Sequence, residues 1–215
     1  MNLSATTFAT FEQYRPLALR TEAPLPTTIA RLDHAALGLI TETGEVVTVA
    51  KRIVIYGKSL DDTNKDDGKT LRQNLFEEIG DVCWYLAIAD DALQGSLFSH
   101  HFKKLVPLRR ELVTPIQRLD RASLSLAAAT GRIASIVLQL QRFPTTLGTS
   151  EVRDLTGSMN SIAQNLVDLC DIAGLNLIDI MNDNIAKLRK RFPNAYSAEA
   201  AEARADKGGL SALNS

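Results

Sequence analysis

The feature that most constrains the fold of this chain is a set of long proline-free spans in which apolar residues recur every three or four positions. Such spacing is typical of amphipathic helices, which a proline would end or kink. No segment shows the sustained alternation of apolar and polar residues that marks a half-buried strand. The pattern therefore predicts an all-α helical bundle. Its helices are expected over residues 28–57, 70–93, 98–105, 115–142, 151–173 and 176–191.

The connecting segments carry signals of their own. Residues 57–68 are polar and bounded by glycines, which predicts a loop. Residues 114–117, with the sequence TPIQ, have the composition of a capping box with proline at the first helical position, and so predict a helix start. The segment after Tyr196 is rich in Ala, Glu, Lys and Gly, and we expect it to form an exposed, partly mobile tail.

The chain also contains an internal repeat. A shift of 87 residues places segment 27–44 over segment 114–131, with ten of 18 positions identical. A weaker match, at a shift of 83, places the helix around Ile79 over the helix around Ile162. The shared R-L-D and T-G runs favour duplication over chance resemblance between amphipathic helices. We therefore expect one all-α domain over 1–215, made of a first repeat, a degenerate second repeat with a last helix, and a tail. The expected bounds of these parts are 1–106, 107–197 and 198–215.

Two pairs of carboxylates flank the apolar stripes of the first repeat. Glu42 and Glu45 are three residues apart, and so are Glu78 and Asp81 on the next predicted helix. Residues at this spacing share one helix face. Glu77 adds a further acid beside the second pair. The second repeat lacks these acids, and its corresponding residues are Ala129, Arg132, Asn160, Ser161 and Gln164.

Four like charges beside a core repel one another and lose hydration, which is costly unless a cation compensates. Oxygen ligands without Cys or His favour Mg²⁺ or Mn²⁺. A di-iron carboxylate bundle needs Glu-x-x-His pairs, and none of His34, His100 and His101 lies three residues after a glutamate. A solvated acidic face is the alternative interpretation, because most glutamate pairs at this spacing have that role.

Four pieces of the chain carry a family resemblance, namely FEQYRPLALRT, HAALGLITETGEVVTVAKR, LFEEIGDVCWYLA and NIAKLRKRFPNAYS. Together they resemble the MazG-like nucleoside triphosphate pyrophosphohydrolases of the all-α NTP pyrophosphatase superfamily. The resemblance covers roughly residues 10–95 and 176–197. The signature of that family is E-x-x-E followed on the next helix by E-x-x-D. The residues that match it here are Glu42, Glu45, Glu78 and Asp81.

The chain departs from the family pattern in three ways. Thr41 stands where the family often has an acid directly before the first signature glutamate. About 80 residues, the degenerate repeat, separate the second acidic helix from the N-x-x-K helix, whereas single-domain members join the two almost directly. The loop between the acidic helices is also somewhat longer than usual.

By this resemblance the chain would cleave a (deoxy)nucleoside triphosphate between the α and β phosphates, releasing the monophosphate and pyrophosphate, in nucleotide-pool cleaning or control. The four signature acids would hold Mg²⁺, with Mn²⁺ as a substitute. Asn184, Lys187 and Arg191 match the family's N-x-x-K-L-x-x-R run and would bind the phosphates. An exposed basic face is the alternative for this helix.

The general base and the base-binding wall are less defined. Glu45 and Glu77 are both candidates for the base, because Thr41 cannot serve. Aromatic side chains near the acids would stack on a nucleobase, or else belong to the core. These candidate residues are His34, Trp84 and Tyr85.

Composition limits the partners. The 24 basic and 25 acidic residues give a net charge of −1, which argues against nucleic acid as a partner. No uninterrupted apolar run approaches the ~18 residues of a membrane span, and we expect neither a membrane partner nor a signal peptide. Cys83 and Cys170 are expected to be buried thiols of a cytoplasmic monomer or homodimer. The alternative function is a catalytically inactive helical nucleotide-binding or assembly module.

Overall fold

The computed structural model of the chain describes residues 8–95, 98, 102, 105–108, 113–143 and 147–203, without the side chains of 202 and 203. Within these ranges the chain is all-α and forms no strand, which confirms the predicted fold class. The helices are α1 (Phe11–Leu19), α2 (Thr28–Val54), α3 (Leu71–Ala92), α5 (Pro115–Arg142), α6 (Thr149–Ala173), α7 (Leu177–Arg191) and α8 (Ala198–Ala203).

The five long helices end within a few residues of the predicted bounds because local hydrogen bonds fix them. Thr114 Oγ1 accepts from Gln117 N at 3.2 Å and Thr114 N donates to Gln117 Oε1 at 3.0 Å, so the predicted capping box at the start of α5 is confirmed. The side chain of Asn176 accepts from two backbone N–H groups of the first turn of α7. Gly174, with a φ of 65°, ends α6 in the left-handed conformation that glycine adopts without strain.

Three segments differ from the sequence prediction. The predictions did not include α1, which Thr10 caps. Of the helix expected over 98–105, only Phe98, Phe102 and Leu105 belong to the described residues, and the two phenylalanines are helical and buried. The first six residues of the expected tail form α8, which packs partly against the core. The rest of the tail, 204–215, lies outside the described residues.

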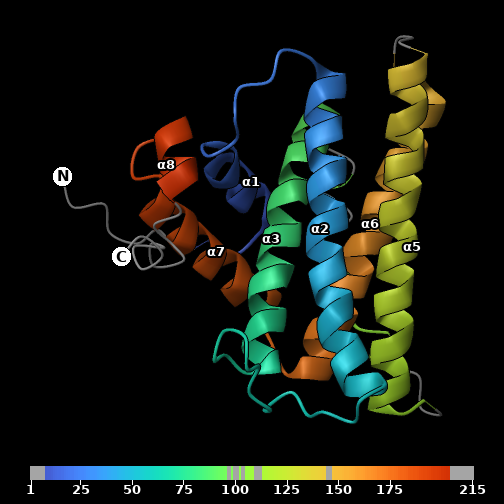
Figure 1. The fold of residues 1–215 in the computed structure, drawn as a ribbon. Coiled ribbons are helices and arrows are strands. Elements are labelled where there is room, and N and C mark those ends of the chain that lie inside the picture. The colour runs from blue at the N-terminus through green and yellow to red at the C-terminus, as the bar shows by residue number, and fades with distance from the viewer. Residues whose placement is uncertain are drawn as a thin grey trace.

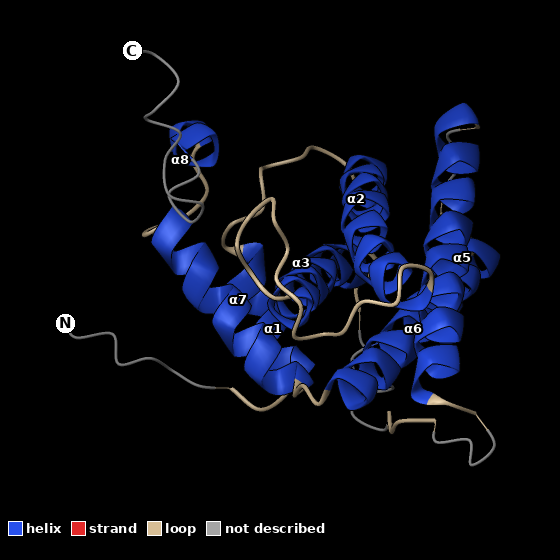
Figure 2. Cartoon of the chain, turned by 60° about the horizontal axis from the view of Figure 1, so that its bottom comes forward, coloured by secondary structure: helices blue, strands red, loops and turns tan. Residues whose placement is uncertain are grey.

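The long helices form two antiparallel pairs that stand side by side (Figure 1). One pair is α2 with α3, the other is α5 with α6, and α2 and α5 pack extensively against each other between them. The core lies inside this arrangement, where Leu39, Ile79, Leu126 and Leu166 are fully buried. The view toward one end of the bundle shows α1 and α7 beside α3, on the side away from α5 (Figure 2). This placement brings α7 against the acidic helix α3.

Residues 87 positions apart meet at the interface between the two pairs. The hydroxyl groups of Thr43 and Thr130 lie 3.1 Å apart in a buried hydrogen bond. The buried thiols of Cys83 and Cys170 also lie close enough for Cys170 to raise the pKa of Cys83, although burial is the larger cause. Contact between equivalent residues is what a twofold-related pair of repeats would give. The duplication stays a prediction. Of these two contacts, the one between Cys83 and Cys170 concerns the second helix, and it fits a shift of 87.

One described helix, α5, is long and apolar enough to cross a membrane by length and composition alone. The sequence analysis did not single out this helix as a possible membrane span, because Ser, Thr and Arg132 interrupt its apolar residues. In this structure α5 packs against α2 and α6, and core helices of globular proteins pass the same test. The absence of a membrane partner therefore stays a prediction.

Candidate metal centre

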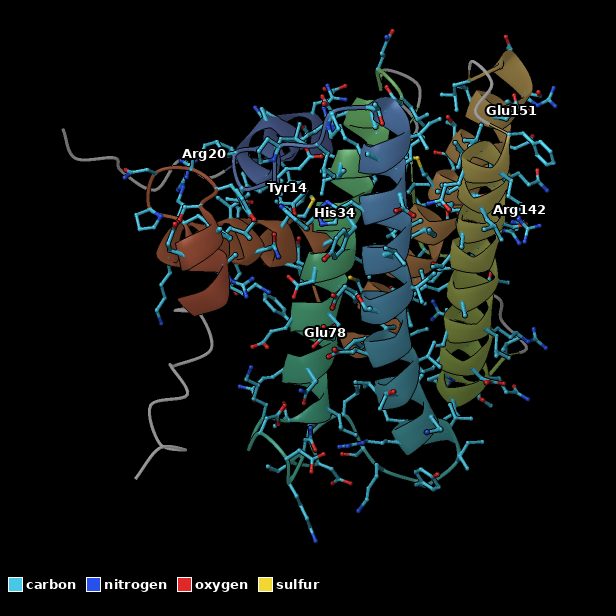
Figure 3. All side chains as sticks on the ribbon, turned by 45° about the horizontal axis from the view of Figure 1, so that its top comes forward. Tyr14, Arg20, His34, Glu78, Arg142 and Glu151 are labelled. Atoms are coloured by element: carbon cyan, nitrogen blue, oxygen red, sulfur yellow. The ribbon has the colours of Figure 1, made fainter. Side chains whose placement is uncertain are left out.

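Three of the four signature acids converge between α2 and α3. Carboxylate oxygens of Glu42, Glu78 and Asp81 all lie within 4.8 Å of one another, and each side chain is partly buried. Glu42 comes from α2, whereas Glu78 and Asp81 lie one turn apart on α3. Figure 3 shows Glu78 on α3, on the side that faces α2. Glu45, the fourth predicted ligand, is exposed and does not belong to this group of three.

The cluster is electrostatically strained when no cation is bound. Burial, followed by the neighbouring charges of Glu45 and Asp81, raises the pKa of Glu78 to about 9. Burial also raises the pKa of Glu42, followed by the charge of Asp81. A hard divalent cation relieves such repulsion and takes oxygen ligands. The donor set therefore fits Mg²⁺ or Mn²⁺, with Glu42, Glu78 and Asp81 as the residues that would hold it.

Asp81 has two partners on α7. Lys187 Nζ donates to both carboxylate oxygens of Asp81, at 2.6 Å for Oδ2. Asn184 Nδ2 donates to Asp81 Oδ1 at 2.9 Å. The other end of the Asn184 amide accepts a hydrogen bond from the Tyr14 hydroxyl at 2.8 Å. Asn184 was predicted to bind phosphate, but it is only 3% exposed and both ends of its side chain are in use. In this structure it is placed to orient Asp81, and its contact with a phosphate stays a prediction.

Two cavities adjoin the acidic cluster. One measures about 710 Å³ and the other about 460 Å³. Both are lined by Glu45, Glu78, Asp81 and Lys187, so the acids and the lysine stand at the junction. Each volume is within the range of ordinary small-molecule sites.

The smaller cavity, called the aromatic cavity below, holds the predicted base-binding wall. The rings of His34, Trp84 and Tyr85 stack edge to face, with centroids 4.7 to 5.7 Å apart. All three line the cavity together with Arg191, which was predicted to bind phosphate. The guanidinium carbon of Arg191 lies 5.7 Å from the centre of the Phe192 ring. These aromatics thus line the same cavity as the acids Glu42, Glu78 and Asp81, and their contact with a base stays a prediction.

The polar groups of the aromatic cavity differ in whether they have hydrogen-bond partners. Trp84 Nε1 donates to Ala18 O at 3.1 Å and Thr21 Oγ1 at 3.0 Å, so its polar edge is already satisfied. His34 Nδ1 is buried and has no hydrogen-bond partner within the described ranges. Burial lowers the pKa of His34, which keeps the ring neutral near pH 7.

The larger cavity, called the polar cavity below, contains residues that the sequence analysis did not single out. Lys69 and Arg52 line it, and each already has an acidic partner. Lys69 Nζ lies 2.5 Å from Glu77 Oε2, and Arg52 Nη2 lies 3.1 Å from Asp66 Oδ2. The sequence held a signal for Arg52, because it lies seven residues, or two helical turns, after Glu45 on the same face of α2. No local sequence pattern points to Lys69, which lies in the loop between α2 and α3.

The pairing with Lys69 bears on the choice of general base. Glu77, one of the two candidates, is held by Lys69, and this hydrogen bond raises the pKa of Lys69. Glu45 lines both cavities and lies beside Glu78. Of the two, Glu45 is therefore the better placed to take a proton from a water molecule at the junction.

The chain was compared with known proteins. No protein family model, no curated protein and no solved structure matches it. What the site does is therefore argued from its own geometry and from the sequence resemblance given above.

Proposed function

We propose that this protein is a metal-dependent hydrolase that converts a (deoxy)nucleoside triphosphate to the monophosphate and pyrophosphate. The observation that carries the proposal is the position of the acidic cluster. Glu42, Glu78 and Asp81 lie between a cavity with aromatic walls and a cavity with basic and amide side chains. A nucleotide needs these three environments in this order, for its base, its metal-bound phosphates and its distal phosphates.

The roles of the residues follow from this placement. His34, Trp84 and Tyr85 would contact the base in the aromatic cavity. Lys187 and Arg191 would steady the phosphates, and Lys187 reaches both cavities from α7. The resemblance to MazG-like pyrophosphohydrolases supports the same roles for these residues.

The reaction needs a cation, and Mg²⁺ bound by the acidic cluster would neutralise the phosphates and lower the pKa of an attacking water. Glu45 would accept the proton of that water at a carboxylate oxygen, since it is exposed at the junction. The walls formed by Trp84 and Tyr85 would limit water access around the base. Nucleotide-pool cleaning or control in the cytoplasm is the biological role that we propose for this activity.

The test is a panel of ribo- and deoxyribonucleoside triphosphates, incubated with and without Mg²⁺, with both products resolved by ion-exchange chromatography. Monophosphate and pyrophosphate in equal amounts, abolished by EDTA, are the expected result. Glu42→Gln and Asp81→Asn should each lower turnover by about a hundredfold or more, because each removes a direct ligand oxygen. Asp120→Asn, an equivalent change at an exposed position on α5, should leave turnover unchanged.

The alternative, a non-catalytic nucleotide-binding or assembly module, gives a different result in the same panel. Such a module would bind a nucleotide, measured by equilibrium dialysis, and release no product. Release of the diphosphate and orthophosphate would also contradict the proposal, because it would place the cleaved bond between the β and γ phosphates.

A further inference from the structure

We infer that Tyr14, on α1, is a positioning residue of the metal centre. It orients Asn184, and Asn184 in turn orients the ligand Asp81. The inference rests on the acidic cluster of the proposed function. It adds a residue that touches neither the cluster nor the two cavities.

The contacts form one continuous chain across three helices. The hydroxyl of Tyr14 on α1 donates to Oδ1 of Asn184 on α7 at 2.8 Å. Nδ2 of Asn184 then donates to Oδ1 of Asp81 on α3 at 2.9 Å. Tyr14 is fully buried and Asn184 is 3% exposed, so water does not compete for these bonds. Figure 3 shows Tyr14 at the side of α3 on which α1 packs.

Donor and acceptor chemistry fixes the direction of this chain. An ionised carboxylate only accepts hydrogen bonds, so the amide must turn its NH₂ group toward Asp81. Its carbonyl oxygen then faces Tyr14 and needs a donor. Burial, followed by the charges of Cys83 and Asp81, raises the pKa of Tyr14, so the hydroxyl keeps its proton. The phenol therefore satisfies the amide oxygen in the orientation in which Asn184 holds the carboxylate of Asp81.

Close packing of the backbones supports this arrangement. Gly80, next to Asp81 on α3, is buried, and a Cβ added there would lie 3.2 Å from Asn184 Cβ and 3.3 Å from Nδ2. A glycine inside a helix costs about 1 kcal/mol relative to alanine. Its absence of a side chain lets α7 approach α3 closely enough for the bond from Asn184 to Asp81.

The orientation of Asp81 has a consequence for the cation. Asn184 occupies one side of Oδ1, which fixes the plane of the carboxylate, while Oδ2 accepts from Lys187 alone among the described residues. A cation that displaces Lys187 from Oδ2 would then meet a ligand that is already oriented. Partners of this kind typically change metal affinity by 10- to 100-fold when they are removed.

The experiment measures Mn²⁺ binding to the full chain by electron paramagnetic resonance of the free ion. Tyr14→Phe removes one hydroxyl and keeps the ring, and we expect Kd to rise about fivefold. Asn184→Ala should raise Kd by about tenfold or more, because it removes the contact to the ligand itself. The double variant should match Asn184→Ala within about twofold, since Tyr14 acts only through Asn184.

Controls separate positioning from general stability. Tyr56→Phe changes a tyrosine that is 63% exposed and should leave Kd unchanged. A lower melting temperature of Tyr14→Phe with an unchanged Kd would show that Tyr14 is a core residue alone, and would overturn the inference. Equal effects of Tyr14→Phe in the wild-type and Asn184→Ala backgrounds would also overturn it. If the wild-type chain binds no Mn²⁺, the metal centre of the proposed function fails as well.

Discussion

Replacing Glu78 with glutamine should stabilise the metal-free protein. Glu78 lies partly buried among Glu42, Glu45 and Asp81, and its pKa is raised to about 9. The unfolded chain exposes this side chain to water, where its pKa returns to about 4.5. Glutamine has a similar shape and carries no charge, so it removes the electrostatic penalty and keeps the packing.

The magnitude follows from the difference between the two pKa values. At pH 7 the folded state holds a proton that the unfolded state has released. Holding it there costs about 1.4 kcal/mol for each of roughly 2.5 pH units, or about 3.5 kcal/mol. The carboxylate of Glu78 is partly exposed, and solvent screening reduces this figure. We therefore expect Glu78→Gln to raise the free energy of unfolding by about 1 to 2 kcal/mol at pH 7.

The pH dependence has a definite sign. Below pH 4.5 Glu78 is protonated in both states and imposes no penalty. Between 4.5 and about 9 the folded state binds more protons than the unfolded state, so stability falls as pH rises. Above about 9 the full penalty is present. Glu78→Gln should flatten this decline, and its advantage should be smallest near pH 5.

Urea unfolding, followed by circular dichroism in EDTA at about pH 5, 7 and 9, measures the effect. Millimolar Mg²⁺ should stabilise the wild-type chain more than Glu78→Gln, because the cation binds only the folded cluster. Asp120→Asn, at an exposed site on α5, should change neither the stability nor its pH dependence. If Glu78→Gln is less stable than wild type in EDTA at pH 7, the acidic cluster is not strained and the reasoning fails.

Three further predictions concern the cavities and the assembly. Lys187→Ala should lower kcat/KM by about tenfold, or about 1.4 kcal/mol, without weakening Mn²⁺ binding. If this variant instead binds Mn²⁺ more tightly and keeps its turnover, Lys187 serves only to neutralise Asp81 in the absence of metal. Gly38→Ala should raise KM, because the new Cβ would overlap the ring of Tyr85. As a control, Gly131→Ala on α5 places its Cβ in open space and should raise the free energy of unfolding by about 0.5 to 1 kcal/mol. Light scattering should give the mass of one or two chains, and a mass of four or more would contradict the expected monomer or homodimer.

The long helices could be predicted from the sequence because their causes are local. Apolar spacing identifies the buried stripe, and residues 114–117 contain the whole capping box that starts α5. The clustering of Glu42 with Glu78 and Asp81 was also predicted, since each pair shares a helix face beside the core. The duplication, including the shift of 83 assigned to the second helix, stays a prediction, although Cys83 and Cys170, which are 87 positions apart, lie close together.

Under the unbroken shift of 87, the second repeat keeps one acid of the site. Asp81 then corresponds to Asp168 and Glu78 to Asn165, whereas a shift of 83 leaves no acid at either position. Asp168 is buried and accepts a hydrogen bond from Leu108 N at 2.6 Å. If the two segments are repeats, the second has lost the acidic cluster, and the one carboxylate of the site that it keeps is bound to a backbone N–H.

The sequence by itself determined the helices, their caps and the faces that carry the acids, because these depend on residues within a few positions of one another. Only the tertiary structure decided that Glu45 lies outside the group of three, and that Asn184 faces Asp81 and Tyr14. A helix fixes which side chains share a face, whereas distances between side chains on different helices depend on how closely those helices pack. Here that closeness depends on Gly80, which admits α7 against α3 and brings residues 103 and 170 positions apart into one chain of hydrogen bonds.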